Sequence, residues 1–281
     1  MVVKVDDIIA ALEALAPSRL AEAWDNVGLQ VGHPEWSVQR ILVALDPTPE
    51  VVEEAVDTGA SVIITHHPLI FRPLRHLNLA TAAGALVQRL IDERVAVISA
   101  HTNLDSVQGG INDVLAEIIG LKAVVVLQPA AADEQCGLGR VGKLDQPVRL
   151  EALVTNIQQR MGLPHIRYAG DPDRSVQRVA VCSGSGGSLL EVFLASPADV
   201  FVTGDVRYHD AREIEAHRRG VIDIGHFESE RIIVQHLAER LSAWLAKKGL
   251  RATVAQAVCE KTPFKTVNAK QSKQKLGGDC S

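Results

Sequence analysis

The sequence predicts an α/β protein built from two related, interlinked halves. Residues 37–65 align without a gap with residues 175–203, and both segments open on Ser-Val-Gln-Arg. In each segment an apolar strand is followed by a turn rich in Pro or Gly, a helical pattern and a second apolar strand ending in Thr. This β-α-β order favours a parallel sheet covered by helices.

The similarity continues into a third strand in each half. The segments RVAVISAHTNLD and RGVIDIGHFESE both contain a short apolar strand that ends in His, with an acid four residues later. His101 therefore corresponds to His226, and Asp105 corresponds to Glu230. Two related halves that each deliver this His and acid from a strand end predict a site at the interface between the halves.

The length of 281 residues suits one large domain or two ordinary ones. We expect a first α/β half over residues 1–125 and a second over 126–267, whose C-terminal part could pack back on the first. The remaining polar, glycine-bearing tail, 268–281, is expected to be disordered. Hydrophobic residues make up 47% and charged residues 22% of the chain, as in a globular protein with ample core.

Composition also excludes several classes of partner. The net charge of −5 gives no basic patch, so nucleic acid is not indicated. No apolar run approaches the roughly 20 residues that a membrane span needs. The N-terminal segment is typical of an amphipathic helix and not of a signal peptide, which predicts a cytoplasmic protein. The four cysteines lack Cys-x-x-Cys spacing, which argues against a thiolate zinc site and against a disulfide framework.

Six potential metal ligands follow apolar strands, at the edge where parallel sheets bind ligands: His66, His67, His101, Asp105, His226 and Glu230. Imidazole and carboxylate together suit divalent metals. The set is too large for one tetrahedral ion with an open position. It fits two ions roughly 3.5–4 Å apart, with carboxylates as candidate bridges. The lack of cysteine favours Zn, Fe, Mn or Ni over Cu(I) and does not choose among them.

Each ligand has an ordinary alternative explanation. His66 and His67 precede Pro68 and could reflect turn chemistry alone, and Asp105 or Glu230 could cap a helix. Gathered at equivalent strand ends, however, the six favour the metal site. At a strand end, the two adjacent histidines can splay so that each serves a different ion.

Two further segments leave alternatives open. SGSGGS (183–188) lies between a strand and a helix, so its backbone could bind an anion or simply form a tight turn. Asp205, Tyr208 and His209 stand at the position equivalent to the histidine pair. They could supply acid–base groups, or they could be only the polar start of a helix.

The chain resembles the Nif-three-like family, also known as the GTP cyclohydrolase I type 2 homologues. The resemblance rests on five motifs in the family's order: WDNVGLQVG, THHPLIF, SAHTNLD, TGDVRYHDA and DIGHFESE. It extends from about residue 5 to TPFKTV at 262–267. It implies a dinuclear metal centre between two interlinked domains and assembly into a ring-shaped homohexamer.

Carried over by position, the family's metal ligands fall on His66, His67, Asp105, His226 and Glu230. His101 would be an additional ligand or an outer group. The hypothesis for function is a two-metal hydrolase acting on a small molecule, of the GTP cyclohydrolase type, in which His101 or His209 moves the proton. The alternative is a non-catalytic metal-binding protein, either a metallochaperone or a regulatory partner.

Overall fold

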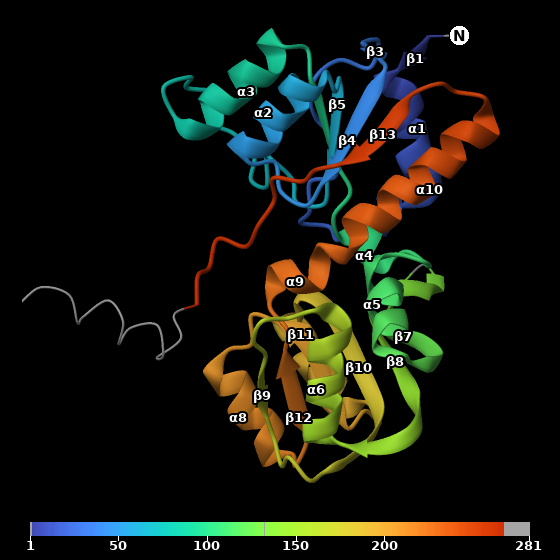
Figure 1. Cartoon of the computed structure of the whole chain (residues 1–281), viewed down its shortest axis with the longest axis vertical. Helices are drawn as coiled ribbons and strands as arrows, with labels where there is room; N and C mark the ends of the chain where they lie inside the picture. Colours follow the sequence, from blue (N-terminus) through green and yellow to red (C-terminus); the bar gives the residue numbers. More distant parts are fainter. Residues whose placement is uncertain (1, 132, 267–281) are drawn as a thin grey trace, which may run out of the picture.

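The structure is a computed structural model that describes residues 2–131 and 133–266. It has two α/β parts, one above the other in Figure 1, each with its own sheet. The fold class is thus the expected one. The expected disordered tail, 268–281, lies outside the described residues.

The first sheet has five strands, and its neighbouring strands β13, β4, β5 and β6 are parallel, whereas β2 is antiparallel. In spatial order they are β13 (Thr253–Gln256), β4 (Arg40–Ala44), β5 (Val62–Thr65), β6 (Ala96–Ser99) and β2 (Gly28–Val31). A small antiparallel ribbon of β1 (Val3–Lys4) and β3 (Ser37–Val38) lies beside this sheet.

Helices cover both faces of the first sheet, which is why its central strands β5 and β6 are buried at every position and mostly apolar. Val62 and Ile64 of β5 pack with the core that includes α1 and α10, whereas Ile63 packs with α2 and α3. The four helices are α1 (Val5–Leu15), α2 (Pro49–Thr58), α3 (Ala82–Asp92) and α10 (Ile232–Lys248). A short helical turn, η1 (Ser18–Leu20), follows α1.

The second sheet has six strands, and its central strands β10, β11 and β12 are parallel. In spatial order they are β7 (Lys122–Ala130), β8 (Asp133–Arg149), β10 (Ser175–Ser185), β11 (Val200–Gly204), β12 (Gly220–Asp223) and β9 (Arg167–Ala169). Its helices are α5 (Ile111–Ile119), α6 (Leu150–Met161), η2 (Gly186–Leu189), α7 (Leu190–Ala195) and α8 (Tyr208–Ala216). The segments that align in the sequence thus form the parallel strands at the centre of both sheets.

The two parts exchange helices. The long helix that follows β6 and the short α4 is α5, and it places Leu115 and Ile119 in the core of the second sheet. The helix after β12, α10, places Leu237 and Leu241 in the core of the first sheet. The chain then adds β13 beside β4. Each core therefore contains a helix that follows a strand of the other sheet.

Two short helices lie where the parts meet: α4 (Thr102–Ser106) and α9 (His226–Glu230). They directly follow β6 and β12, so the carboxyl ends of both sets of parallel strands point to this junction. The division expected between residues 125 and 126 stays a prediction, and β7 runs across that point. No helix within the described ranges is long and apolar enough to cross a membrane.

Candidate metal centre

The adjacent histidines leave the end of β5. The strand ends at Thr65, and the backbone N–H groups of His66 and His67 donate to carbonyls at the end of β4, those of Ala44 (3.3 Å) and Leu45 (2.9 Å). The Thr65 hydroxyl donates to the His67 carbonyl at 2.8 Å. These bonds fix the turn before Pro68, so both imidazoles have defined directions.

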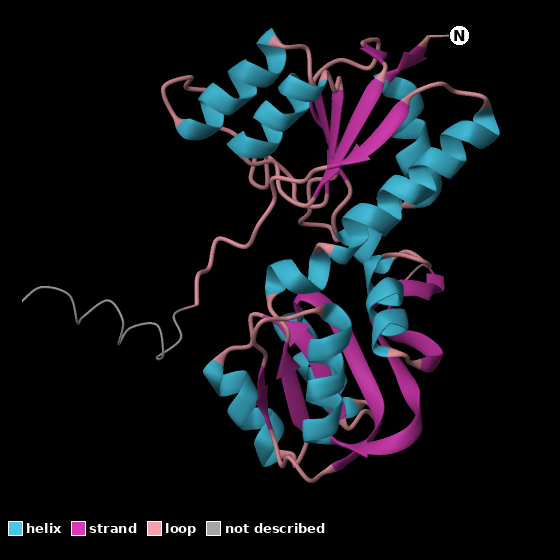
Figure 2. Cartoon of the chain, viewed as in Figure 1, coloured by secondary structure: helices cyan, strands magenta, loops and turns pink. Residues whose placement is uncertain are grey.

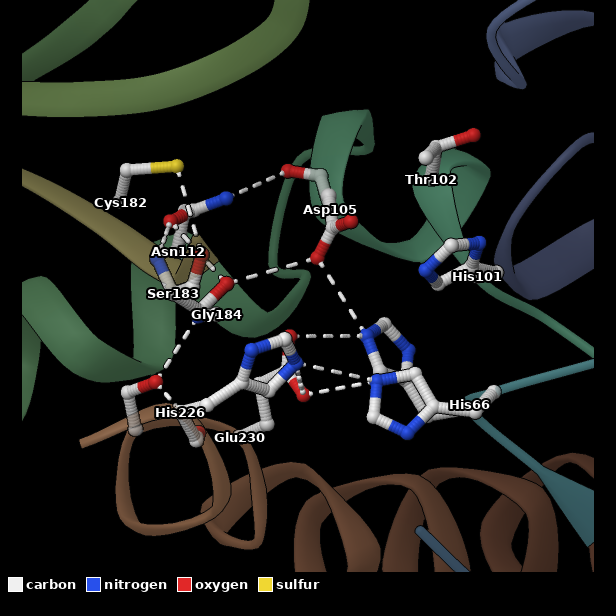
Figure 3. Close-up of polar contacts among 12 residues, drawn as sticks. His66, His101, Thr102, Asp105, Asn112, Cys182, Ser183, Gly184, His226 and Glu230 are labelled. Carbon is white, nitrogen blue, oxygen red and sulfur yellow. Dashed lines mark hydrogen bonds and ion pairs between the residues drawn. The ribbon is translucent and has the colours of Figure 1, made fainter. Parts of the chain in front are cut away.

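The other groups come from the short helices at the junction. His101 and Asp105 belong to the start and body of α4, and His226 and Glu230 are the first and last residues of α9. One turn of helix separates the members of each pair, which places them on one side. Figure 3 shows these side chains converging with His66 on a common space.

The six residues His66, His67, His101, Asp105, His226 and Glu230 are called the cluster below. In each of its four imidazoles, Nδ1 lies at hydrogen-bonding distance from an oxygen atom. His66 Nδ1 contacts the carbonyl of Ala100 at 3.0 Å. The other three contact carboxylates, and the pairs are His67–Asp46 at 2.7 Å, His101–Asp25 at 2.9 Å and His226–Asp205 at 2.8 Å. With Nδ1 engaged as a donor, Nε2 presents its lone pair to the cluster, the arrangement common in metal-binding histidines.

The Nε2 atoms of three histidines face the carboxylate of Glu230. Its Oε2 lies 3.0 Å from Nε2 of His67 and 3.0 Å from Nε2 of His226. Its Oε1 lies 3.6 Å from Nε2 of His66, which is also 3.7 Å from Asp105 Oδ1. The two oxygens of the Glu230 carboxylate thus face different histidines: Oε1 faces His66, and Oε2 faces His67 and His226. The donor atoms of His66, His67 and His101 also lie within 4.8 Å of one another.

Electrostatics favour positive charge in this space. Burial opposes protonation of His67, but the carboxylates of Asp46 and Glu230 outweigh it and raise the pKa of His67 to about 10. The Glu230 carboxylate likewise raises the pKa of His226 to about 9. Burial opposes ionisation of Glu230, yet the surrounding imidazoles hold its pKa well below its usual range. The carboxylates therefore attract cations here, either protons on the rings or a metal ion.

Two buried atoms of the cluster lack hydrogen bonds. His66 Nε2 and Glu230 Oε2 have no hydrogen-bond partner among the described residues, so the contacts above are ion pairs without hydrogen-bond geometry. Unpaired buried polar groups are costly and uncommon in folded proteins. Both atoms are typical metal donors, and imidazole and carboxylate are both common ligands of divalent ions. The residues therefore fit a metal centre.

The glycine-rich segment at the end of β10 makes room for Glu230. Gly184 has φ +61°, and a Cβ built there would lie 2.1 Å from Glu230 Oε1. The N–H groups of Ser183, Gly184 and Gly186 already donate to Asn112 Oδ1, Ser229 Oγ and Thr203 Oγ1, at 2.9, 2.8 and 2.9 Å. These three N–H groups are therefore not free to bind an anion.

Two cavities adjoin the cluster and share His67 and His226. The tryptophan cavity, about 490 Å³, is lined by five cluster residues and by Trp24, Phe71, Leu138, Ser183, Ser185 and Ser188. The arginine cavity, about 610 Å³, is lined by Arg167, Asp46, Asp205, Asp223, Glu228 and Phe264, among others. The cluster is therefore open from two sides.

The structure brings six of the seven candidate residues together. His209 is exposed on α8 and lines neither cavity, so it lies outside the cluster. Asp205, considered for acid–base work, instead holds His226 from a left-handed backbone position, φ 51°. Asp tolerates this conformation better than most residues.

Sequence reasoning gave Asp25 and Asp46 no role in orienting histidines. Each precedes a turn, and only the structure shows which imidazole it reaches. Asp25 also accepts from the N–H of Thr102 at 3.0 Å. Burial opposes ionisation of Asp25, but contacts with His101 and Thr102 lower its pKa to about 2.

Comparisons with known proteins agree with one another. The family model Duf34/NIF3 (NGG1p interacting factor 3) matches residues 3–263. A Clostridium perfringens protein named GTP cyclohydrolase 1 type 2 homolog is 37% identical over 238 residues, which cover 85% of this chain and 91% of that protein. A Streptomyces coelicolor protein of the same name is 39% identical over 232 residues, 81% of each chain.

Solved structures show the same architecture. A Bacillus cereus protein related to NIF3 superposes with a TM-score of 0.90 at 26% identity, covering 95% of this chain and 100% of that one. A crystal structure of a Staphylococcus aureus protein gives a TM-score of 0.89 at 29% identity, covering 94% of this chain and 99% of that one.

Proposed function

This chain belongs to the Duf34/NIF3 family, and we propose that it is a dinuclear metal-dependent hydrolase of a small molecule. The observation that carries the proposal is the pair of buried, unpaired atoms, His66 Nε2 and Glu230 Oε2, in a space enclosed by further imidazoles. Buried atoms of this kind are stabilised by coordinating a metal ion or by accepting a hydrogen bond, and two of them beside further imidazoles favour the metal ion.

Glu230 divides the donors into two sets. His66, Asp105 and Glu230 Oε1 would hold one ion. His67, His226 and Glu230 Oε2 would hold the other. Glu230 would then contribute one oxygen to each set, in agreement with the position of its carboxylate among the imidazoles. Bound ions of this kind supply Lewis acidity and activate water near neutral pH.

His101 is the residue we assign to proton transfer. Its Nδ1 is held by Asp25, and its ring lies in the wall of the tryptophan cavity beside His66 and His67. An imidazole fixed in this way can accept a proton from water or return one to a leaving group. His209 loses this role because it is remote from the cluster.

The name of the curated relatives makes GTP the first compound to test. The test is substrate loss measured by chromatography with protein loaded with Zn, Fe, Mn or Ni. We expect turnover in the wild type, none in Glu230→Gln, and a large decrease in His101→Gln with metal retained. His209→Gln is the matched control and should behave as the wild type.

Metal binding without turnover of any compound would contradict the hydrolase and favour a metal carrier. A carrier would pass its ions to a metal-free acceptor protein. We further propose that the protein is cytoplasmic and that the 30.3-kDa chains assemble into a ring-shaped homohexamer, which sedimentation analysis tests.

A further inference from the structure

We propose that Asn112 is the positioning residue for Asp105, and that it thereby sets the affinity of one of the two proposed metal sites and not of the other. The inference rests on the proposed function, because Asp105 is assigned there to one ion together with His66. It adds a residue that would contact neither ion and that acts through the helix carrying a ligand.

The side chain of Asp105 has weaker support than the proposed histidine ligands. In His66, His67 and His226, Nδ1 lies between 2.7 and 3.0 Å from an oxygen atom. Among the described residues, the carboxylate of Asp105 has one hydrogen-bond donor, the Ser183 hydroxyl, at 3.4 Å from Oδ1. Carboxylates that bind metal are held by hydrogen bonds as histidines are, so Asp105 depends on contacts made by its backbone.

The amide of Asn112 holds that backbone. Its Nδ2 donates to the carbonyl of Asp105 at 3.1 Å, and its Oδ1 accepts the N–H of Ser183 at 2.9 Å. Figure 3 shows the amide between these two residues. Only one orientation of the amide satisfies both partners, because a carbonyl only accepts and an N–H only donates. The side chain of Asn112 is fully buried, so bulk solvent does not compete for these bonds.

These bonds join the two parts of the molecule beside the cluster. Asp105 lies on α4, which follows the first sheet, Asn112 lies in the first turn of α5, and Ser183 lies on β10 of the second sheet. The end of α4 is also held by Arg140, which donates to the carbonyl of Val107 at 3.0 Å. Loss of the Asn112 amide should therefore leave α4 helical and release mainly Asp105.

The second set of donors has a separate support. The hydroxyl of Ser229 on α9 accepts the N–H of Gly184 at 2.8 Å and donates to the carbonyl of His226 at 2.7 Å. The hydrogen bonds of Asn112 within the described chain reach Asp105 and Ser183 and no residue of this second set. A change at Asn112 should therefore weaken one site, whereas a general loss of structure would weaken both.

The test is the amount of zinc bound per full-length chain, measured by elemental analysis over a series of buffered free zinc concentrations. The wild type should bind about two ions. Asn112→Ala should bind one ion as the wild type does and should need about tenfold or more free zinc for the other. Ser183→Ala keeps every backbone contact, and loss of its hydroxyl should weaken the same ion about threefold.

Asn103→Ala is the matched control. Asn103 is a buried asparagine on α4 whose Nδ2 donates to a backbone carbonyl, that of Ala16, at 2.7 Å. Asn103→Ala should bind both ions as the wild type does. Circular dichroism checks that each variant is folded, and Ser183→Ala decides the question if Asn112→Ala does not fold.

Unchanged zinc affinity in Asn112→Ala, equal weakening of both ions, or the same weakening in Asn103→Ala would overturn the inference. Unchanged affinity in Ser183→Ala would overturn it if Asn112→Ala is unfolded. These results leave the dinuclear centre standing, because the wild type still binds two ions. A wild type that binds no more than one ion would overturn the dinuclear centre and the inference with it.

Discussion

Glycine at position 184 gives the Glu230 carboxylate its room. The left-handed backbone there suits glycine, and a side chain would occupy the position of Glu230 Oε1. Three residues further along the chain, in η2, is Gly187, where a Cβ would meet nothing closer than 3.6 Å. The two glycines therefore form a matched pair for substitution.

Gly184→Ala should weaken metal binding about tenfold or more. The added methyl group would displace the Glu230 carboxylate, which could then no longer contribute an oxygen to both proposed metal sites. Gly187→Ala should bind metal as the wild type does. Zinc titration monitored by calorimetry measures both, with thermal unfolding as the check that each variant is folded. Equal zinc affinity in the two variants would show that Gly184 has no role at the centre.

At the scale of single residues, sequence reasoning predicted which candidate ligands gather better than it predicted the groups that orient them. The histidines and acids follow apolar strands, and the internal repeat pairs His101 with His226, so their gathering could be predicted. Asp25 reaches His101 across 76 positions of sequence. Such a contact depends on how the turns fold, which periodicity does not record.

At the scale of elements, the segment that follows β13 is linked to the candidate metal centre through the turn after β4. The Glu260 carboxylate accepts the N–H groups of Leu45 (2.9 Å) and Asp46 (2.8 Å) at the end of β4. Asp46 in turn holds His67. Glu54 on α2 anchors the same segment by accepting the N–H of Val258 at 3.0 Å. The C-terminal segment thus supports the turn that orients His67, a proposed metal ligand.

Glu260→Ala should lower the free energy of unfolding by about 1–3 kcal/mol, because two backbone N–H groups lose their acceptor. Amide hydrogen exchange over residues 257–264 should also become faster. Lys261→Ala changes the neighbouring exposed residue and serves as the control. Unchanged exchange in Glu260→Ala would contradict the anchoring role. Denaturant titration and mass spectrometry provide the two measurements.

The parallel strands could be predicted because both faces of each sheet are covered and the central strands are therefore mostly apolar. The exchange of α5 and α10 could not. Both helices show the same apolar periodicity, which specifies a buried face but not the sheet that covers it. The edge strand β13 is short and partly exposed, so it gives little signal.

For the whole molecule, the exchanged helices make the two parts depend on each other. A fragment of residues 1–121 lacks α10 and β13, and so it exposes the apolar face that Leu237 and Leu241 cover. Residues 122–281 lack α5, which covers the second sheet. Neither fragment should fold alone, since each loses a large part of one core.

Co-expression of the two fragments should restore a complex with the circular dichroism and cooperative melting of the intact chain. The single fragments should show poorly dispersed NMR spectra. A well-dispersed spectrum from either fragment alone would contradict the mutual dependence of the parts. It would also show that the first sheet or the second is an independent domain.

The most direct test of the account is the metal content of the purified protein, measured by elemental analysis without chelator or added metal. We predict about two equivalents of divalent metal per chain. The double variant His66→Ala/Glu230→Ala should retain the fold and bind none. A wild-type protein that binds no metal even after reconstitution, or that saturates at one equivalent, would contradict the dinuclear centre.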